Sequence, residues 1–214
     1  MSFRDRIEAG RRLARELERY RSPTTVVLGI PRGGVPVAAE VARALGAQLD
    51  VVVARKAGAP GQPELAIGAV APDGTRYVND DLVAGLGLTD PQIDTAFERA
   101  QREAREREER FRGGRTAPVL RGRTAVVVDD GIATGATLRA ALRSVRRSKP
   151  ARLVAAAPVA PSGSRDAFRG EADEVVVVEE SPMFMAVGQF YEEFPQVSDE
   201  DVQELLRVTA KVAV

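Results

Sequence analysis

The sequence feature that most constrains the fold is the stretch 126–137, Val-Val-Val-Asp-Asp-Gly-Ile-Ala-Thr-Gly-Ala-Thr. Its first three residues are β-branched and uniformly apolar, a pattern typical of a strand covered on both faces of a parallel sheet. The apolar residues after the stretch, Leu138, Ala141, Leu142 and Val145, recur at helical spacing. The stretch therefore predicts a strand, a loop of small residues at the strand's carboxyl end, and a helix.

This loop has the chemistry of a phosphate site beside a sugar site. The free N–H groups and positive dipole at the start of the helix attract a phosphate, and Gly131 and Gly135 let the backbone approach it closely. The carboxylates of Asp129 and Asp130 repel a phosphate, so their natural partners are sugar hydroxyls or a divalent cation. A simpler interpretation is that the two acids only cap the turn.

The whole string of apolar residues, two acids and Gly-x-x-Thr-Gly-x-Thr resembles the phosphoribosyl pyrophosphate (PRPP) motif of type I phosphoribosyltransferases. The resemblance implies that Asp129 and Asp130 bind the ribose 2′- and 3′-hydroxyls and are catalytic. Some purine-type members carry a further carboxylate, a proposed base, where this chain has Ala133. That role must come from elsewhere or be absent. The resemblance also implies that the 5′-phosphate is bound by Ala133, Thr134, Gly135, Ala136 and Thr137.

A second strand, loop and helix precede the motif. A predicted strand at 24–30 leads into the turn Pro31-Arg32-Gly33-Gly34, after which helical spacing resumes. Such a turn is a weak signal alone, but its position resembles the family's pyrophosphate-binding loop. The resemblance implies that Arg32, Gly33 and Gly34 bind pyrophosphate, with Arg32 catalytic, and that a strained or cis peptide lies between Ile30 and Gly34.

A third buried strand, at 49–54, leads to Arg55 and Lys56. The two cations could form a solvated surface pair, but adenine-type members of the family place an Arg-Lys pair before a flexible hood loop that closes over PRPP. The resemblance implies that both bind pyrophosphate and are catalytic. We expect the Gly- and Pro-rich residues 58–64 to be irregular and to exclude water on closing. Glu64 is a candidate for assisting the acceptor, although a surface role in stabilising the loop is the simpler alternative.

Two further apolar runs, at 153–159 and 175–178, bring the principal strands to five. The predicted fold is α/β, a five-stranded, mainly parallel sheet flanked by helices, as in type I phosphoribosyltransferases, with a small hood subdomain. The hood includes a hairpin at Pro72-Asp73-Gly74 and a charged helix capped by Thr89 and Gln92. We expect residues 1–214 to form one domain, with a hood built from about 1–22, 57–115 and 181–214.

Aromatic residues gather in the segment 181–195. Such residues can stack on a flat base, and the family builds its base pocket partly from segments near the chain ends. Phe184, Phe190 and Tyr191 are therefore candidate base-binding residues. The alternative is that most of these rings fill the core.

Composition limits the chemistry. The chain has no Cys and no His, which excludes disulfides, thiolate nucleophiles and histidine bases. Its 31 basic and 31 acidic residues balance, so we expect neither nucleic acid nor a membrane surface as partner. Catalysis must use carboxylates, Arg, Lys, backbone amides and Mg²⁺. We expect PRPP oxygens and water to hold the magnesium, with Asp129 and Asp130 as candidate outer-shell partners. The lack of a long apolar run or signal peptide favours a cytoplasmic protein.

The functional hypothesis is a phosphoribosyltransferase that moves the 5-phosphoribosyl group from PRPP to a nitrogenous base and releases pyrophosphate. Two alternatives stay open, a non-catalytic PRPP sensor that regulates a partner and an enzyme that hydrolyses PRPP. The sequence does not identify the acceptor. It also does not decide whether the chain forms a homodimer.

Overall fold

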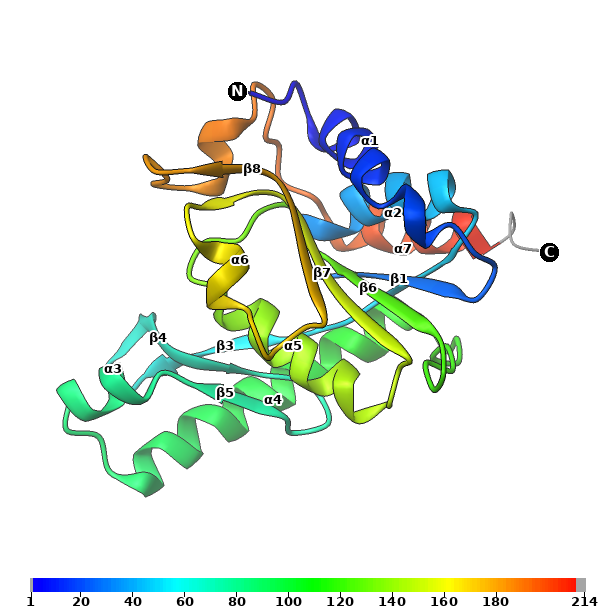
Figure 1. Cartoon of the computed structure of the whole chain (residues 1–214). Helices are drawn as coiled ribbons and strands as arrows, with labels where there is room; N and C mark the ends of the chain where they lie inside the picture. The colour runs from blue at the N-terminus through cyan, green and yellow to red at the C-terminus, as the bar shows by residue number, and fades with distance from the viewer. Residues whose placement is uncertain (1, 211–214) are drawn as a thin grey trace.

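The computed structural model describes residues 2–210 and contains a large sheet of five parallel strands (Figure 1). Their order is β2-β1-β6-β7-β8. This confirms the predicted fold class. The strands are β1 (Thr25–Gly29), β2 (Gln48–Val51), β6 (Thr124–Val128), β7 (Arg152–Pro161) and β8 (Glu174–Ser181).

Alternate residues of each strand of the large sheet enter different apolar cores. Val126 and Val128 of β6 pack on one face, whereas Ala125 and Val127 pack on the other. The first face is covered by α2 and α7, and α1 packs on α2; the second face is covered by α5 (Figure 1). The helices are α1 (Arg6–Glu16), α2 (Gly34–Leu45), α5 (Ala136–Arg147), α6 (Ser164–Ala167) and α7 (Asp199–Ala210), with a short 3₁₀ turn, η1 (Glu18–Tyr20), after α1.

A smaller, antiparallel sheet stands apart from the large one. Its order is β3-β4-β5, and the turn between β4 and β5 contains Pro72-Asp73-Gly74, as the sequence predicts. The long helix α4 covers this sheet and carries Phe97 and Ala100 into a small core with Ile67. The elements are β3 (Arg55–Ala59), β4 (Gln62–Val70), β5 (Arg76–Val78), α3 (Asp80–Gly85) and α4 (Asp90–Arg112).

The expectation of irregular structure at 58–64 is wrong, because most of this segment belongs to the β3–β4 hairpin. Ala59 pairs with Gln62 across the two-residue turn Pro60-Gly61. Proline presets φ for the first turn position, and Gly61 supplies φ +75° at the second. The same residues that suggested a loop therefore form a tight turn, with shifts in strand register between Ala57 and Ala59.

The segments assigned to the hood lie in different places. Residues 55–112 build the small sheet and its helices, whereas Phe3 of the N-terminal segment packs with Phe190 and Tyr191 in a separate cluster that includes Val159 of β7. Phe190 ends a 3₁₀ turn, η2 (Val187–Phe190). The predicted hood boundaries stay a prediction, and residues 1 and 211–214 lie outside the described part of the chain.

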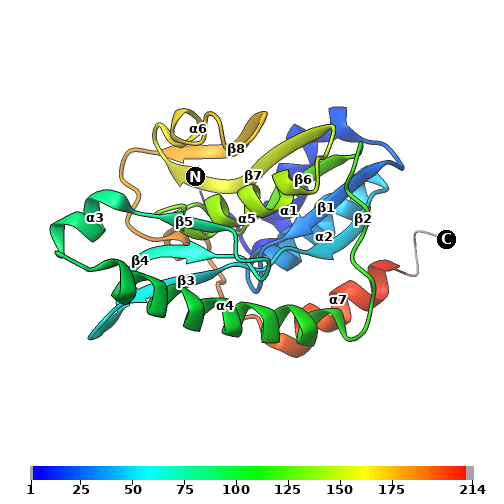
Figure 2. The same cartoon turned by 90° about the horizontal axis from the view of Figure 1, so that it is seen from below.

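Helix α4 connects the two sheets. In Figure 2 it runs beneath the small sheet and reaches α7. Its Phe97 is buried in the small core, whereas its Ala104 and Phe111 are buried in the large core with α2 and α7. Within residues 2–210, no helix combines the length and apolar character that crossing a membrane requires.

Candidate functional site

The carboxyl ends of β1 and β6 bring two of the predicted loops side by side. Gly29 and Val128 are paired in the parallel ladder, and the Ile30 N–H donates to the Val128 carbonyl at 2.8 Å. The Pro31–Arg32 peptide is cis, which confirms the expected unusual peptide in this turn. The turn that carries Arg32 is therefore held directly against the strand that carries the two acids.

Close packing between these loops requires glycine at two positions. A Cβ atom on Gly33 would lie 1.9 Å from the Asp130 Oδ2 atom, and one on Gly34 would lie 2.6 Å from the Val128 carbonyl oxygen. No side chain fits in either space. Gly33 and Gly34 thus keep the Pro-Arg-Gly-Gly turn in contact with the acidic pair.

Asp129 and Asp130 are mostly buried. The Asp130 backbone N–H donates to the Asp129 Oδ1 atom at 2.9 Å. Burial, and then the neighbouring Asp130 carboxylate, raise the pKa of Asp129 well above its ordinary range. Burial also raises the pKa of Asp130, while the guanidinium of Arg6 opposes that rise. The pair therefore carries charge that the fold holds at a cost.

Arg6, from α1, is a member of the site that sequence reasoning missed. Its Nε atom donates to the Asp130 Oδ2 atom at 2.9 Å, and its Nη1 atom donates to the Pro195 carbonyl at 2.7 Å. Its guanidinium also lies 3.8 Å from the centre of the Phe194 ring. No local signal marked it, because Arg6 is one of several arginines in an Arg- and Glu-rich segment and lies 124 residues from Asp130 in sequence.

Tyr191 also holds the acidic pair in place. Its hydroxyl donates to the Asp130 carbonyl at 2.6 Å, and burial raises the pKa of that hydroxyl. Its ring packs on Phe3, with ring centres 5.6 Å apart. Of the other predicted base-binding aromatics, Phe190 is also buried. The half-buried Phe184 stacks on it, with the two ring centres 5.3 Å apart. Their proposed contact with a base stays a prediction, as does the role of the exposed Glu64.

The loop after the acids encloses a cavity of about 130 Å³ at the start of α5. Gly135, at φ +74°, directs the backbone into the helix, whose first residue is Ala136. Lys56 of the small sheet reaches the same cavity. The cavity thus combines a helix amino terminus, a carboxylate and one cation. The predicted site residues that line it are Lys56, Asp129, Ala133, Thr134, Gly135, Ala136 and Thr137.

The structure does not bring Arg32 and Arg55 into this cavity. The Arg32 Nη1 atom lies 3.5 Å from the Oδ1 atom of Asp199 in α7. The Oδ2 atom of the same carboxylate lies 2.8 Å from the Arg110 Nη1 atom. The Arg55 Nη2 atom donates to Glu103 of α4 at 2.7 Å. Sequence reasoning missed both acidic partners, because they lie on distant helices. Among the three predicted pyrophosphate-binding cations, Lys56 alone lines the loop cavity.

The donor chemistry at the loop suits a hard cation such as magnesium only in part. Asp129 and Asp130 supply carboxylate oxygens, the ligands that magnesium prefers. However, residues 2–210 contain no group of three or more His, Cys, Asp or Glu side chains placed to hold a metal ion. Any magnesium here would take most of its ligands from substrate and water.

Comparison with known proteins agrees with this architecture. A Mycobacterium tuberculosis protein named "Putative phosphoribosyl transferase" is 49% identical over 204 residues, which are 95% of this chain and 46% of that protein. The chain therefore spans less than half of that relative. The crystal structure of the protein TT1426 from Thermus thermophilus is 43% identical, with a TM-score of 0.81 over 96% of this chain and 98% of that one.

The family comparison covers nearly the whole chain. The family model described as "Phosphoribosyl transferase domain" matches residues 4–194. These residues include the five strands of the large sheet, the small sheet and the segment from Phe184 to Tyr191. The protein thus belongs to the phosphoribosyl transferase domain family.

Proposed function

We propose that the chain transfers the 5-phosphoribosyl group of PRPP to a nitrogenous base and releases pyrophosphate, with magnesium bound to PRPP. One observation carries the proposal. Asp129, the small-residue loop at the start of α5, and Lys56 meet at the carboxyl edge of the large sheet, with Asp130 directly after Asp129. Parallel α/β sheets bind their ligands at such an edge.

Each part of this edge suits one part of PRPP. The amide groups of residues 133–137 would hold the 5′-phosphate, since the start of α5 leaves backbone N–H groups free for an anion. Asp129 and Asp130 would accept hydrogen bonds from the ribose hydroxyls. Arg6 and Tyr191 would keep Asp130 in place for that task.

The leaving pyrophosphate would lie between the Arg32 turn and Lys56. Arg32 and Arg55, which pair with Asp199 and Glu103 in this structure, would turn away from these acids to bind it. Magnesium, held mainly by diphosphate oxygens and water, would neutralise charge on the leaving group. The protein's share of catalysis is then orientation and electrostatic stabilisation, because the site offers no histidine or cysteine for covalent chemistry.

The direct test is an assay of pyrophosphate release from PRPP and magnesium, with pooled nucleobases and with none. Release that requires one pool supports transfer and begins to identify the acceptor. Release without any base contradicts transfer and indicates hydrolysis. Absence of release, together with calorimetric binding of PRPP, contradicts catalysis on these bases and favours a sensor.

The substitution Asp130→Asn provides the blank for this assay. We expect it to weaken PRPP binding by about 1–3 kcal/mol, because a neutral amide forms a weaker hydrogen bond to a ribose hydroxyl than a carboxylate does. Calorimetric titration with PRPP and magnesium measures the change. Asp81→Asn, at an exposed position on α3, is the matched control. Unchanged affinity in a folded Asp130→Asn protein would refute the ribose assignment.

A further inference from the structure

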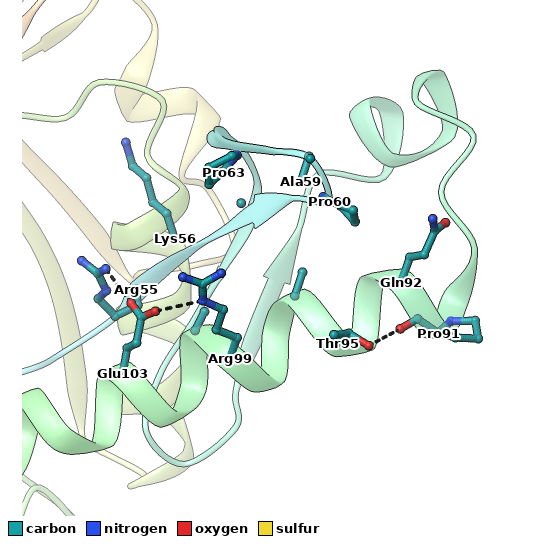
Figure 3. Close-up of a pocket in the computed structure, with 14 residues that line it drawn as sticks. Arg55, Lys56, Ala59, Pro60, Pro63, Pro91, Gln92, Thr95, Arg99 and Glu103 are labelled. Atoms are coloured by element: carbon teal, nitrogen blue, oxygen red, sulfur yellow. Dashed lines mark hydrogen bonds and ion pairs between the residues drawn. The ribbon is translucent and has the colours of Figure 1, made fainter.

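A second cavity lies between the β3–β4 hairpin and α4, outside the loop cavity (Figure 3). Its volume is about 540 Å³, which is within the range of small-molecule sites. The two cavities have only Lys56 in common. In Figure 3 the Lys56 side chain extends away from α4. The function proposed above uses Arg55 and Lys56 at one end of this cavity but none of its lining residues on α4.

One face of α4 forms a wall of this cavity. The lining residues of α4 recur at steps of three and four, which places them on a single stripe of the helix. Small residues occupy the middle of the stripe and leave the hollow open. Across it, the hairpin presents Pro60 of its turn and Pro63 of β4. The stripe consists of Pro91, Gln92, Thr95, Ala96, Arg99, Ala100 and Glu103.

Charge gathers at one end of the cavity. The Nη2 atom of Arg55 in β3 lies 2.7 Å from the Glu103 Oε2 atom. The Nε atom of Arg99 lies 3.4 Å from the Oε1 atom of the same carboxylate. Two guanidinium groups therefore share one carboxylate, which leaves an excess of positive charge. The Nε atom of Arg55 is buried and has no hydrogen-bond partner among the described residues. A buried donor without a partner is costly, so an acceptor that reached this atom would be bound favourably.

We propose that this cavity is a second ligand site, for a small organic anion with a flat apolar body. The apolar surface of the prolines and alanines would hold the body. The guanidinium groups of Arg55 and Arg99 would bind the anionic group, because guanidinium presents several donors to carboxylate, sulfonate or phosphate oxygens. Occupancy does not require the acidic pair, so this site stands whether or not the chain transfers a phosphoribosyl group.

The probe that matches this chemistry is 8-anilinonaphthalene-1-sulfonate, which has flat rings and one anionic group. Isothermal titration calorimetry should show one saturable site per chain. Ala96→Trp fills the hollow and should weaken binding by at least about tenfold. Arg99→Gln removes one exposed guanidinium and should weaken binding by about threefold to fivefold. The neutral probe N-phenyl-1-naphthylamine should bind Arg99→Gln and the unmodified protein equally.

Controls separate this site from other surfaces. Glu98→Trp and Arg102→Gln change exposed positions of α4 outside the cavity and should leave binding of the sulfonate unchanged. Asp130→Asn should also leave it unchanged, which distinguishes this site from the proposed PRPP site. Circular dichroism checks that each variant is folded. No saturable binding, or equal binding by Arg99→Gln and the unmodified protein, would overturn the proposal. So would equal binding by a folded Ala96→Trp.

Discussion

The two sheets of the molecule are built on different principles. The large sheet is parallel, and its strands bury apolar side chains on both faces, so polar groups concentrate in the loops at its edge. The small sheet is antiparallel, and within residues 2–210 its core has six buried residues, three of which are alanines. Its strand β3 supplies Arg55 and Lys56. The two acids and Arg32 thus belong to the large sheet, whereas Arg55 and Lys56 belong to the small sheet.

This difference suggests a division of work. Loops on a rigid, deeply buried sheet can hold Asp129 and Asp130 in fixed positions, although the raised pKa values of both groups favour their protonated forms. The small sheet has less apolar area to lose, so we expect it to open at a lower free-energy cost. Movement of that sheet would shift Lys56 relative to the loop cavity. The following predictions test this difference, from the largest expected effect to the smallest.

The sharpest comparison uses two phenylalanines of α4. Phe97→Ala and Phe111→Ala should each destabilise the packing around the altered residue by about 4 kcal/mol, because both side chains are fully buried. Hydrogen exchange should show that Phe97→Ala exposes mainly the amides of β3–β5. Phe111→Ala should lower protection in the large sheet too. If Phe97→Ala lowers the protection of β6 equally, the two sheets unfold as one unit and the comparison fails.

Arg6→Met tests how the region around the large sheet stabilises its buried carboxylates. The change leaves the Asp130 carboxylate without its cation, so we expect a loss of about 3 kcal/mol in the free energy of unfolding at pH 7. Urea denaturation measures this loss. Arg15→Met, an exposed position on the same helix, should change stability by less than about 0.5 kcal/mol. Equal effects of the two variants would show that the Arg6–Asp130 contact contributes little.

Asp129→Asn tests the cost of the buried charge through its pH dependence. Because the pKa of Asp129 is raised, the folded protein binds that proton more tightly than the unfolded chain does. Its stabilising contribution is therefore complete below the ordinary pKa of aspartate and is lost as the pH rises through the raised pKa. Asparagine keeps no such proton, so the stability of the variant relative to the unmodified protein should increase with pH. Thermal denaturation from pH 4 to pH 8 measures this difference.

Asp5 provides a control of opposite sign for that experiment. The Glu8 backbone N–H holds the pKa of Asp5 below its ordinary value, so its stabilising contribution exists above that ordinary value and is lost as the pH falls. Asp5→Asn should therefore be less stable than the unmodified protein at neutral pH, and the gap should close in acid. If Asp129→Asn is also less stable than the unmodified protein at neutral pH, and this difference disappears in acid, the assignment of Asp129 as a carboxyl group with a raised pKa is contradicted.

The smallest expected effect is at the small sheet. Glu103→Gln weakens a partly exposed ion pair with Arg55, so stability should change by less than about 1 kcal/mol. If Arg55 joins the pyrophosphate site after leaving Glu103, the variant should bind PRPP and magnesium slightly more tightly in calorimetric titration. Glu98→Gln, exposed on the same helix, should have no effect. Weaker binding of PRPP by Glu103→Gln would contradict a holding role for Glu103.

The sequence predicts the large sheet well, because its strands are short apolar runs that end at turn residues. It also predicts the strand-loop-helix around Asp129 and Asp130, since that motif is local. It fails at β3, where Gly58 and Pro60 suggested a loop, although Gly58 lies in the strand and Pro60 in the tight hairpin turn that follows it. It also fails for Arg6, which lies 124 residues from Asp130 in sequence. No local pattern encodes such a contact, because only the tertiary fold brings the two residues together.

Helix α4 gives the chain an unexpected sensitivity to insertions. Phe97 and Phe111 point into different cores from the same face of one uninterrupted helix, and the 14 positions that separate them make nearly four whole turns. One added or deleted residue between them would turn one aromatic ring by about 100° relative to the other. Many positions along this helix are exposed and would tolerate substitution. The number of residues between Phe97 and Phe111, by contrast, has to stay the same for both rings to reach their cores. Sequence changes that preserve the number of residues there should therefore be accepted far more readily than changes that alter it.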